Sequence, residues 1–153
     1  EETEQIFKIN FFGTLNCLHA LLPFLKKKNK SQVIFMSSVA GYRGLPYAAA
    51  YCSSKSAITT FAESIFNQCK NLGIAIRVIN PGFVKTPLTD KNKFKMPMII
   101  PAEKAADIMY KKIVFSKKFE INCPWLFCFI MKILRVLPNS VYFSLTQLLI
   151  KRL

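Results

Sequence analysis

The stretch SVAGYRGLPYAAAYCSSK, residues 38–55, decides the fold, because a strand pattern precedes it and a helical pattern follows from it. The preceding residues 32–37, QVIFMS, are mostly apolar, as in strands buried in parallel sheets. Helical periodicity extends over residues 49–72, and a second apolar run, IAIRVI, occupies residues 74–79. A strand, a helix and a second strand in this order predict a βαβ unit with parallel strands.

Three side chains in this stretch carry candidate chemistry. Tyr51 and Lys55 are four positions apart on the expected helix and therefore share one face. Ser38 stands at the carboxyl end of the expected strand, where ligands bind in open α/β sheets. From the spacing alone, a surface pair on a helix remains an alternative to a catalytic pair.

The catalytic interpretation depends on the acidity of a phenol. Tyrosine has a pKa of about 10, and a cation close by lowers it by about 1–3 units. We therefore expect Lys55 to lower the pKa of Tyr51, Tyr51 to exchange a proton with a substrate oxygen, and Ser38 to bind the same oxygen. These groups move protons and not hydride, so an alcohol/carbonyl reaction would need a cofactor.

Several segments together resemble the short-chain dehydrogenase/reductase family. Tyr51 comes thirteen positions after Ser38, which is the spacing of the family. Residues 80–86, NPGFVKT, are similar to its Pro-Gly-x-Val-x-Thr segment, and residues 9–13, INFFG, resemble its helix with a catalytic asparagine, here Asn10. The resemblance covers most of residues 1–120.

The resemblance implies an NAD(P)-dependent oxidoreductase that interconverts an alcohol and a carbonyl. Tyr51 would be the acid/base, Lys55 would tune it and bind the nicotinamide ribose, Ser38 would orient the substrate, and Asn10 would hold a water in a proton relay. Tyr51 and Lys55 would thus also bind the cofactor. The remaining cofactor-binding positions implied by the resemblance are Pro81, Gly82, Val84 and Thr86.

The sequence lacks the glycine-rich turn that receives a pyrophosphate after the first strand of a dinucleotide-binding fold. We therefore expect an α/β fold that is the C-terminal portion of a doubly wound, Rossmann-like parallel sheet, with the first βαβ units missing. Residues 1–122 would form this part, and residues 123–153 an amphipathic helical tail. NAD and NADP both remain open. The alternative to an enzyme is a truncated, inactive remnant or a membrane-surface binding module.

The other elements follow from periodicity and from proline. The pattern over residues 1–29 predicts one long helix, with Pro23 perturbing its end. Another helix is predicted from residue 101 onward, and a short last strand over residues 119–122. Residues 87–100 show no period and are a candidate loop over the active site. Their apolar side chains would contact an apolar substrate or simply seal the core.

The C-terminal tail is strongly apolar. Its longest apolar run, residues 125–131, is much shorter than the roughly 20 residues of a membrane span. Two amphipathic helices separated at Pro138 fit the pattern better. Such helices suit a membrane interface, a cover over a substrate pocket or a dimer contact.

Composition narrows the classes of function and partner that remain. The net charge is +14, from 22 Lys and Arg against 8 Asp and Glu, but no motif for nucleic-acid binding accompanies it. Five cysteines without a Cys-x-x-Cys pair predict reduced thiols in a cytoplasmic protein and no metal site. We expect a small-molecule, lipophilic substrate and a homo-oligomer in the full-length form, with peripheral membrane contact left open.

Overall fold

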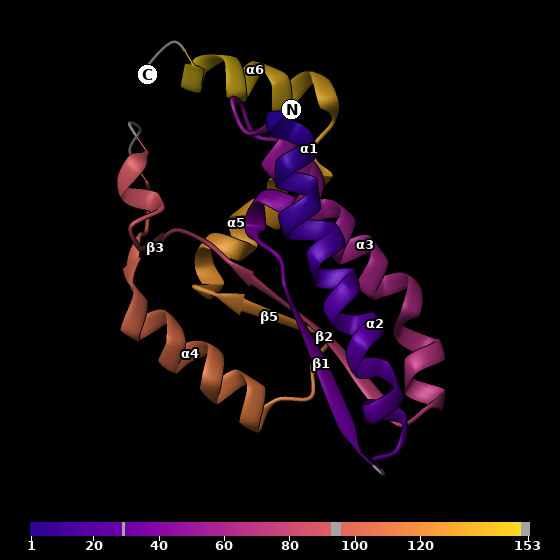
Figure 1. Ribbon diagram of the computed structural model, residues 1–153. Helices are drawn as coiled ribbons and strands as arrows, with labels where there is room; N and C mark the ends of the chain where they lie inside the picture. The colour runs from indigo at the N-terminus through magenta and orange to yellow at the C-terminus, as the bar shows by residue number, and fades with distance from the viewer. Residues whose placement is uncertain (29, 93–95, 151–153) are drawn as a thin grey trace.

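The computed structural model describes residues 1–28, 30–92 and 96–150. Three parallel strands, in the order β1-β2-β5, form its main sheet (Figure 1). They are β1 (Ser31–Met36), β2 (Ile74–Pro81) and β5 (Glu120–Cys123). The expected α/β class and parallel strand order are confirmed.

One face of the sheet is covered by two long helical segments that run side by side in Figure 1. The first consists of α1 (Glu2–Phe7), the π-helical turn η1 (Lys8–Phe12) and α2 (Gly13–Lys26), and the second is α3 (Ala49–Asn71). They bury the main core against β1 and β2 with the side chains Phe35, Ile58, Ala62, Ile76 and Val78, among others.

The long N-terminal helix departs from the expectation in two ways. A π-helical turn at residues 8–12 interrupts it, which the apolar spacing did not indicate. Pro23 lies inside α2, which continues to Lys26. Proline there cannot donate the backbone hydrogen bond to the residue one turn back, and α2 ends three residues later.

The opposite face of the sheet receives α4 (Ala102–Phe115), which Figure 1 shows on the other side from α2 and α3. Arg77, in the middle of β2, is only 4% exposed. Its guanidinium donates to the carbonyl oxygens of Lys112, Ile113 and Lys118 at distances of 2.8–3.0 Å. The arginine thereby binds carbonyl groups at and just beyond the C-terminal end of α4; of these, the Lys112 carbonyl also accepts from the Ser116 amide.

Residues 87–100, between β2 and α4, were expected to form a loop. In the structure, β3 (Val84–Lys85), just before these residues, pairs in parallel with β4 (Ile100–Pro101) at their end, and a 3-10 turn, η3 (Thr89–Lys91), lies between the two strands. Residues 93–95 of the expected lid fall outside the described residues.

The chain ends in α5 (Trp125–Val136) and α6 (Asn139–Ile150), the two helices expected on either side of Pro138. A second core cluster joins α5 to the loop after β1, through the side chains Val39, Tyr42, Phe127, Cys128 and Met131. The division of the chain at residue 123 stays a prediction. Among the described residues, no helix is both long enough and apolar enough to cross a bilayer.

Candidate active site

Ser38 lies just beyond the carboxyl end of β1. Its hydroxyl accepts a hydrogen bond of 3.1 Å from the amide of Ala40, at the start of the 3-10 turn η2 (Val39–Gly41), and donates over 3.5 Å to the carbonyl of Pro81. The side chain is 8% exposed. Ser38 therefore links the ends of two adjacent parallel strands, where ligands bind in this class of fold.

The loop after Ser38 packs directly against the backbone of α3. A Cβ atom on Gly41 would come within 3.0 Å of the carbonyl carbon and oxygen of Lys55, so only glycine fits without displacing backbone. Ser37 donates from its hydroxyl to the same carbonyl oxygen, over 2.9 Å. These two contacts fix the position of the Ser38 loop relative to the turn of α3 that carries Lys55.

Tyr51 and Lys55 lie on the first turns of α3, as the spacing predicted. The Lys55 ammonium nitrogen is 5.7 Å from the centre of the Tyr51 ring and donates over 3.1 Å to the carbonyl of Met36 at the end of β1. The Ser38 hydroxyl acts on the Tyr51 phenol in the direction that lowers its pKa, and the Tyr51 side chain is 37% exposed. The structure thus brings Ser38, Tyr51 and Lys55 together at one corner of the sheet.

The pKa of Tyr51 differs from the sequence-based expectation. Burial raises the pKa of the phenol, and the interaction with the Ser38 hydroxyl lowers it only in part. Burial also lowers the pKa of the Lys55 ammonium. The expected lowering of the Tyr51 pKa by Lys55 is therefore wrong for this chain, because loss of hydration disfavours the phenolate more than the surrounding groups stabilise it.

Asn10 lies within the π-helical turn η1 and reaches the tyrosine only through another residue. Its amide donates over 3.0 Å to the hydroxyl of Ser54, and this hydroxyl donates over 2.8 Å to the carbonyl of Tyr51. The Thr14 hydroxyl donates over 2.7 Å to the carbonyl of Asn10. The role of Asn10 in holding a water stays a prediction.

Ser54 is a site residue that sequence reasoning missed. It is fully buried in the described structure, although serine in a helix is usually exposed. Its position three residues after Tyr51 was the available signal, since residues three apart share a helix face. It connects η1 to the first turns of α3.

The expected cofactor-binding residues follow β2 in the chain. Pro81 accepts the hydrogen bond from the Ser38 hydroxyl, and Val84 pairs with Ile100 in the small sheet. Thr86 forms a compact turn in which its amide donates over 2.8 Å to the Thr89 hydroxyl. Their roles in binding a cofactor remain predictions.

Packing explains why position 82 is a glycine, and the sequence did not reveal this. A Cβ atom there would lie 2.6 Å from a ring carbon of Phe127 on α5. Its amide also donates over 2.7 Å to the carbonyl of Cys123. Glycine at this position therefore lets α5 approach the end of β2.

Comparison with known proteins identifies the family. A model of the short chain dehydrogenase family matches residues 1–96. An uncharacterized oxidoreductase of Myxococcus xanthus is 34% identical over 142 residues, which are 93% of this chain and 56% of that protein. The chain belongs to the short-chain dehydrogenase family.

Two further similarities give the extent of the match. A 3-ketodihydrosphingosine reductase of Bacteroides thetaiotaomicron is 30% identical over 122 residues, which are 80% of this chain and 45% of that protein. A short chain dehydrogenase of Burkholderia cenocepacia, crystallised with NADP, has a TM-score of 0.74 at 22% identity, over 84% of this chain and 54% of that one. The chain spans about half the length of the curated relatives it matches.

The side chains of this short-chain dehydrogenase fit a nicotinamide nucleotide at the Ser38 corner. An ammonium group has three donors, and the hydrogen bond from Lys55 to the Met36 carbonyl uses one of them. The remaining donors suit the hydroxyl groups of a ribose. Among the described residues, no group of three or more His, Cys, Asp and Glu is placed to hold a metal ion.

A half-buried polar network supports the corner from the other side. Glu120 accepts hydrogen bonds from Tyr42, Asn80 and Lys132, and the side-chain oxygen of Asn122 lies 2.9 Å from the Tyr42 hydroxyl oxygen, as a second acceptor for its one proton. Burial acts to raise the pKa of Glu120, but the hydrogen bonds from Lys132 and Tyr42 outweigh it and hold the pKa below the ordinary value. The network connects the Ser38 loop to β5 and α5.

Arg43 ties the same loop to the turn between α5 and α6. One guanidinium nitrogen donates over 2.7 Å to each of the carbonyls of Leu134 and Leu137, and the other donates over 2.6 Å to the side chain of Asn139. The guanidinium carbon lies 4.0 Å from the centre of the Tyr142 ring, and the Tyr142 hydroxyl donates over 2.6 Å to the carbonyl of Gly44. Neither contact was foreseen from the sequence.

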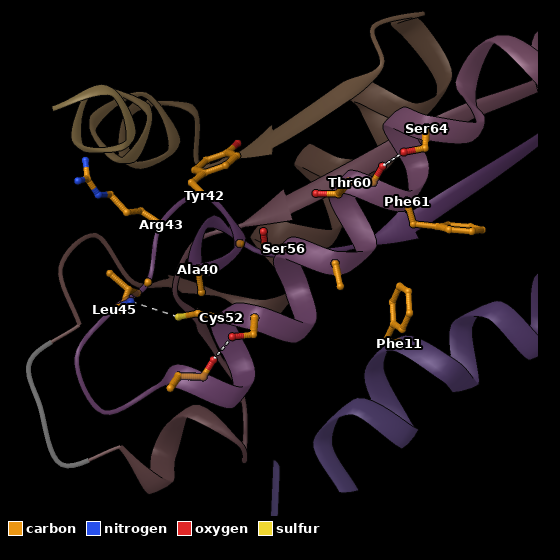
Figure 2. A pocket seen from close by; sticks show the side chains of 15 residues that line it. Phe11, Ala40, Tyr42, Arg43, Leu45, Cys52, Ser56, Thr60, Phe61 and Ser64 are labelled. Carbon is orange, nitrogen blue, oxygen red and sulfur yellow. Dashed lines mark hydrogen bonds between the residues drawn. The ribbon is translucent and has the colours of Figure 1, made fainter. Parts of the chain in front are cut away.

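A hollow of about 830 Å³ opens beside the site rather than within it. Figure 2 shows it between α3, the loop at Arg43 and the ring of Phe11. Its α3 side is formed by residues such as Ser56 and Thr60, which at 3.6 residues per turn point away from the face of Tyr51 and Lys55. None of the four expected catalytic residues lines it, so it is not the site of the expected proton transfer.

Proposed function

We propose that the protein containing this chain is an NAD(P)-dependent oxidoreductase that interconverts an alcohol and a carbonyl, with Tyr51 as the acid/base. The observation that carries the proposal is the convergence of Ser38, Tyr51 and Lys55 at the carboxyl ends of β1 and β2. The Lys55 ammonium nitrogen lies 5.7 Å from the centre of the Tyr51 ring and donates to the carbonyl of Met36, and the Ser38 hydroxyl donates to the carbonyl of Pro81. Two hydroxyl groups at the same corner are suited to bind a single substrate oxygen. Family membership supports the same class of reaction.

The raised pKa of Tyr51 keeps the phenol in its neutral form at neutral pH, and it also makes the phenol a weaker acid than a free tyrosine. Because the phenol remains protonated at neutral pH, it is ready to give its proton to a carbonyl oxygen as that oxygen gains negative charge during reduction. Ser38 donates a second hydrogen bond to the same oxygen and fixes its position.

The cofactor would be bound by Tyr51 and Lys55, together with the segment after β2 that includes Pro81, Gly82, Val84 and Thr86. When bound, it supplies or accepts the hydride that none of these side chains carries. Both NAD and NADP remain within the proposal. The structure of the Burkholderia cenocepacia relative in complex with NADP supports a nicotinamide dinucleotide.

We further propose a lipophilic substrate. The segment between β3 and β4 exposes Leu88, Met98 and Ile99, at 70%, 44% and 39%. Exposed apolar side chains on the segment that follows the expected cofactor-binding residues suit a substrate with one carbonyl on an apolar body. The relative from Bacteroides thetaiotaomicron is a 3-ketodihydrosphingosine reductase, which supports the same substrate class.

A homo-oligomer also remains part of the proposal. The outer surface of the N-terminal helical segment exposes several large apolar side chains, which a second copy would cover. They are Ile9, Phe12, Leu21 and Phe24. Sedimentation of the whole protein, compared with a Phe24→Glu variant, tests this contact.

The alternative of an inactive remnant has less support. A buried serine joins the Asn10 turn to Tyr51, and a glycine lets the Ser38 loop contact α3. An inactive protein does not require either feature for catalysis. Both features are needed where the positions of Tyr51 and Ser38 must be held for chemistry.

The test is a Tyr51→Phe substitution in the whole gene product. With NADH or NADPH and a panel of apolar ketones, we expect the rate of nicotinamide oxidation to fall by at least about 100-fold, because the proton donor is lost. A Tyr110→Phe variant, altered at an exposed position of α4, should retain the wild-type rate. Unchanged turnover in Tyr51→Phe would refute the assigned role.

A further inference from the structure

The outward face of α5 is a stripe of large apolar side chains. Trp125, Phe129, Ile133 and Val136 recur at intervals of three and four residues and are 66%, 55%, 47% and 78% exposed. Residues at this spacing share one side of a helix. The inward face is already packed, because the side chains of Phe127, Cys128 and Met131 belong to the second core cluster.

The helix α6 is still less covered. No residue from Asn139 to Ile150 is charged. Among its described side chains only Tyr142 is buried, at 3% exposed. The exposed large apolar side chains of α6 are Val141, Phe143, Leu145, Leu148 and Ile150. A helix that is apolar on most of its circumference normally lies against other apolar material.

The two helices cannot hide these side chains by turning over. Arg43 binds the last carbonyls of α5, and Tyr142 bonds to the carbonyl of Gly44, so both helices are tied to the loop after β1. The ion pair between Lys132 and Glu120 ties α5 to β5 as well. The apolar stripe is therefore held outward by the fold.

Charge distinguishes the candidate partners. From residue 121 to the C-terminus the sequence contains no Asp or Glu. Of its basic residues, Lys132 is paired with Glu120, Arg135 is exposed, and the two at positions 151 and 152 lie outside the described residues; the net charge of the chain is +14. A second copy docked by two-fold symmetry would place like charges against like charges. Anionic lipid headgroups would instead neutralise them, while the apolar side chains enter the interface.

We propose that α5 and α6 form a docking surface for an anionic membrane, with the α5 stripe at the level of the lipid headgroups. Tryptophan and phenylalanine at the edge of such a surface are suited to that depth. The contact is interfacial, in keeping with helices of twelve residues each. The membrane contact does not depend on the proposed reaction.

Trp125 makes the proposal directly measurable, because it is the only tryptophan of the chain. The whole protein is mixed with vesicles of phosphatidylcholine alone or with added phosphatidylglycerol, and a Trp125→Phe variant supplies the background emission. We expect co-sedimentation with the anionic vesicles, weaker at high salt. We also expect a blue shift of the Trp125 emission and quenching by brominated lipid.

Two variants locate the contact on α5. Phe129→Glu and Ile133→Glu each place a charge in the stripe at an exposed position, and we expect each to reduce vesicle partitioning by roughly tenfold. Phe115→Glu, at an 82% exposed position on α4, is the matched control and should leave partitioning unchanged. Unaltered circular dichroism and melting temperature establish that the variants fold.

Several results would overturn the proposal. Absence of pelleting with anionic vesicles would do so, and so would pelleting without quenching of Trp125, which would place the contact elsewhere. A blue shift that grows with protein concentration in the absence of lipid, together with dimers in sedimentation, would assign the stripe to a second copy instead. Equal losses in Phe129→Glu and Phe115→Glu would also contradict it.

Discussion

The Ser38 corner and the α5–α6 turn are held in different ways. At the corner, backbone lies against backbone: Gly41 contacts the Lys55 carbonyl, and Ser37, 18 residues from Lys55, bonds to the same group. At the turn, long side chains reach across the molecule, since Arg43 binds a carbonyl 91 residues away and Tyr142 one that is 98 residues away. The first arrangement belongs to one strand–helix unit, while the second joins distant parts of the chain.

This difference shows which region of the molecule holds its atoms most rigidly. The corner has little room to move, because close backbone packing resists even a methyl group. The α5–α6 turn depends on a few polar contacts and leaves much apolar surface exposed, which is typical of regions that open locally. Substitutions in the two regions should therefore differ in how much they lower stability.

Gly41→Ala should have the largest effect on stability. The added Cβ would contact the Lys55 backbone at 3.0 Å, and we expect a loss of about 3 kcal/mol in the free energy of unfolding, because neither backbone segment moves aside easily. Gly44→Ala is the matched control, since nothing lies within 4 Å of a Cβ atom there. Urea denaturation measures both, and equal stabilities would contradict the close packing described for the corner.

Arg43→Met should have the next largest effect. It removes the charged donors of the α5–α6 turn, and we expect a loss of about 2 kcal/mol, the scale of a hydrogen bond to a charged group. Limited proteolysis should then cleave first near α6. Arg135→Met, at an exposed position on α5, is the control, and the interpretation fails if both variants resist protease equally.

Tyr142→Phe tests one contact of the same turn. It deletes the hydroxyl that bonds to the Gly44 carbonyl and keeps the ring beneath Arg43, so we expect a loss of about 1 kcal/mol. Hydrogen exchange of α6 should increase while that of α3 stays the same. A uniform increase over the whole chain would show that the two regions are not independent.

The Glu120 network should show a smaller effect, limited to acid pH. Because the pKa of Glu120 is lowered in the folded state, its contribution is complete above the unfolded value of about 4.3 and is lost as the pH falls through the folded value. Below about pH 4.3, Glu120→Gln should therefore lose stability less steeply than the wild type. Glu103→Gln, which removes an exposed carboxylate on α4, should follow the wild-type slope. Parallel profiles for all three proteins would exclude the assigned role of Glu120.

Much of the fold was predictable, because local sequence patterns indicate most of its helices and strands. The runs at residues 32–37 and 74–79 and the helix at 49–72 gave β1, β2 and α3 within one or two residues at most ends. The π-helical turn at Asn10 was not predictable from the sequence. Contacts with Thr14 and with α3 accompany it, and these contacts become visible only in the folded structure. The network around Glu120 likewise joins residues from four separate elements.

The sequence by itself determined the parallel βαβ unit and the meeting of Ser38, Tyr51 and Lys55, because strand ends and helix periodicity are local properties of the chain. Only the tertiary structure decided that the pKa of Tyr51 is raised rather than lowered, since hydration depends on every neighbour. It also decided that Arg43 and Tyr142 hold α5 and α6 with their apolar side chains outward. Such contacts depend on which distant groups the fold brings together, and no local pattern encodes that.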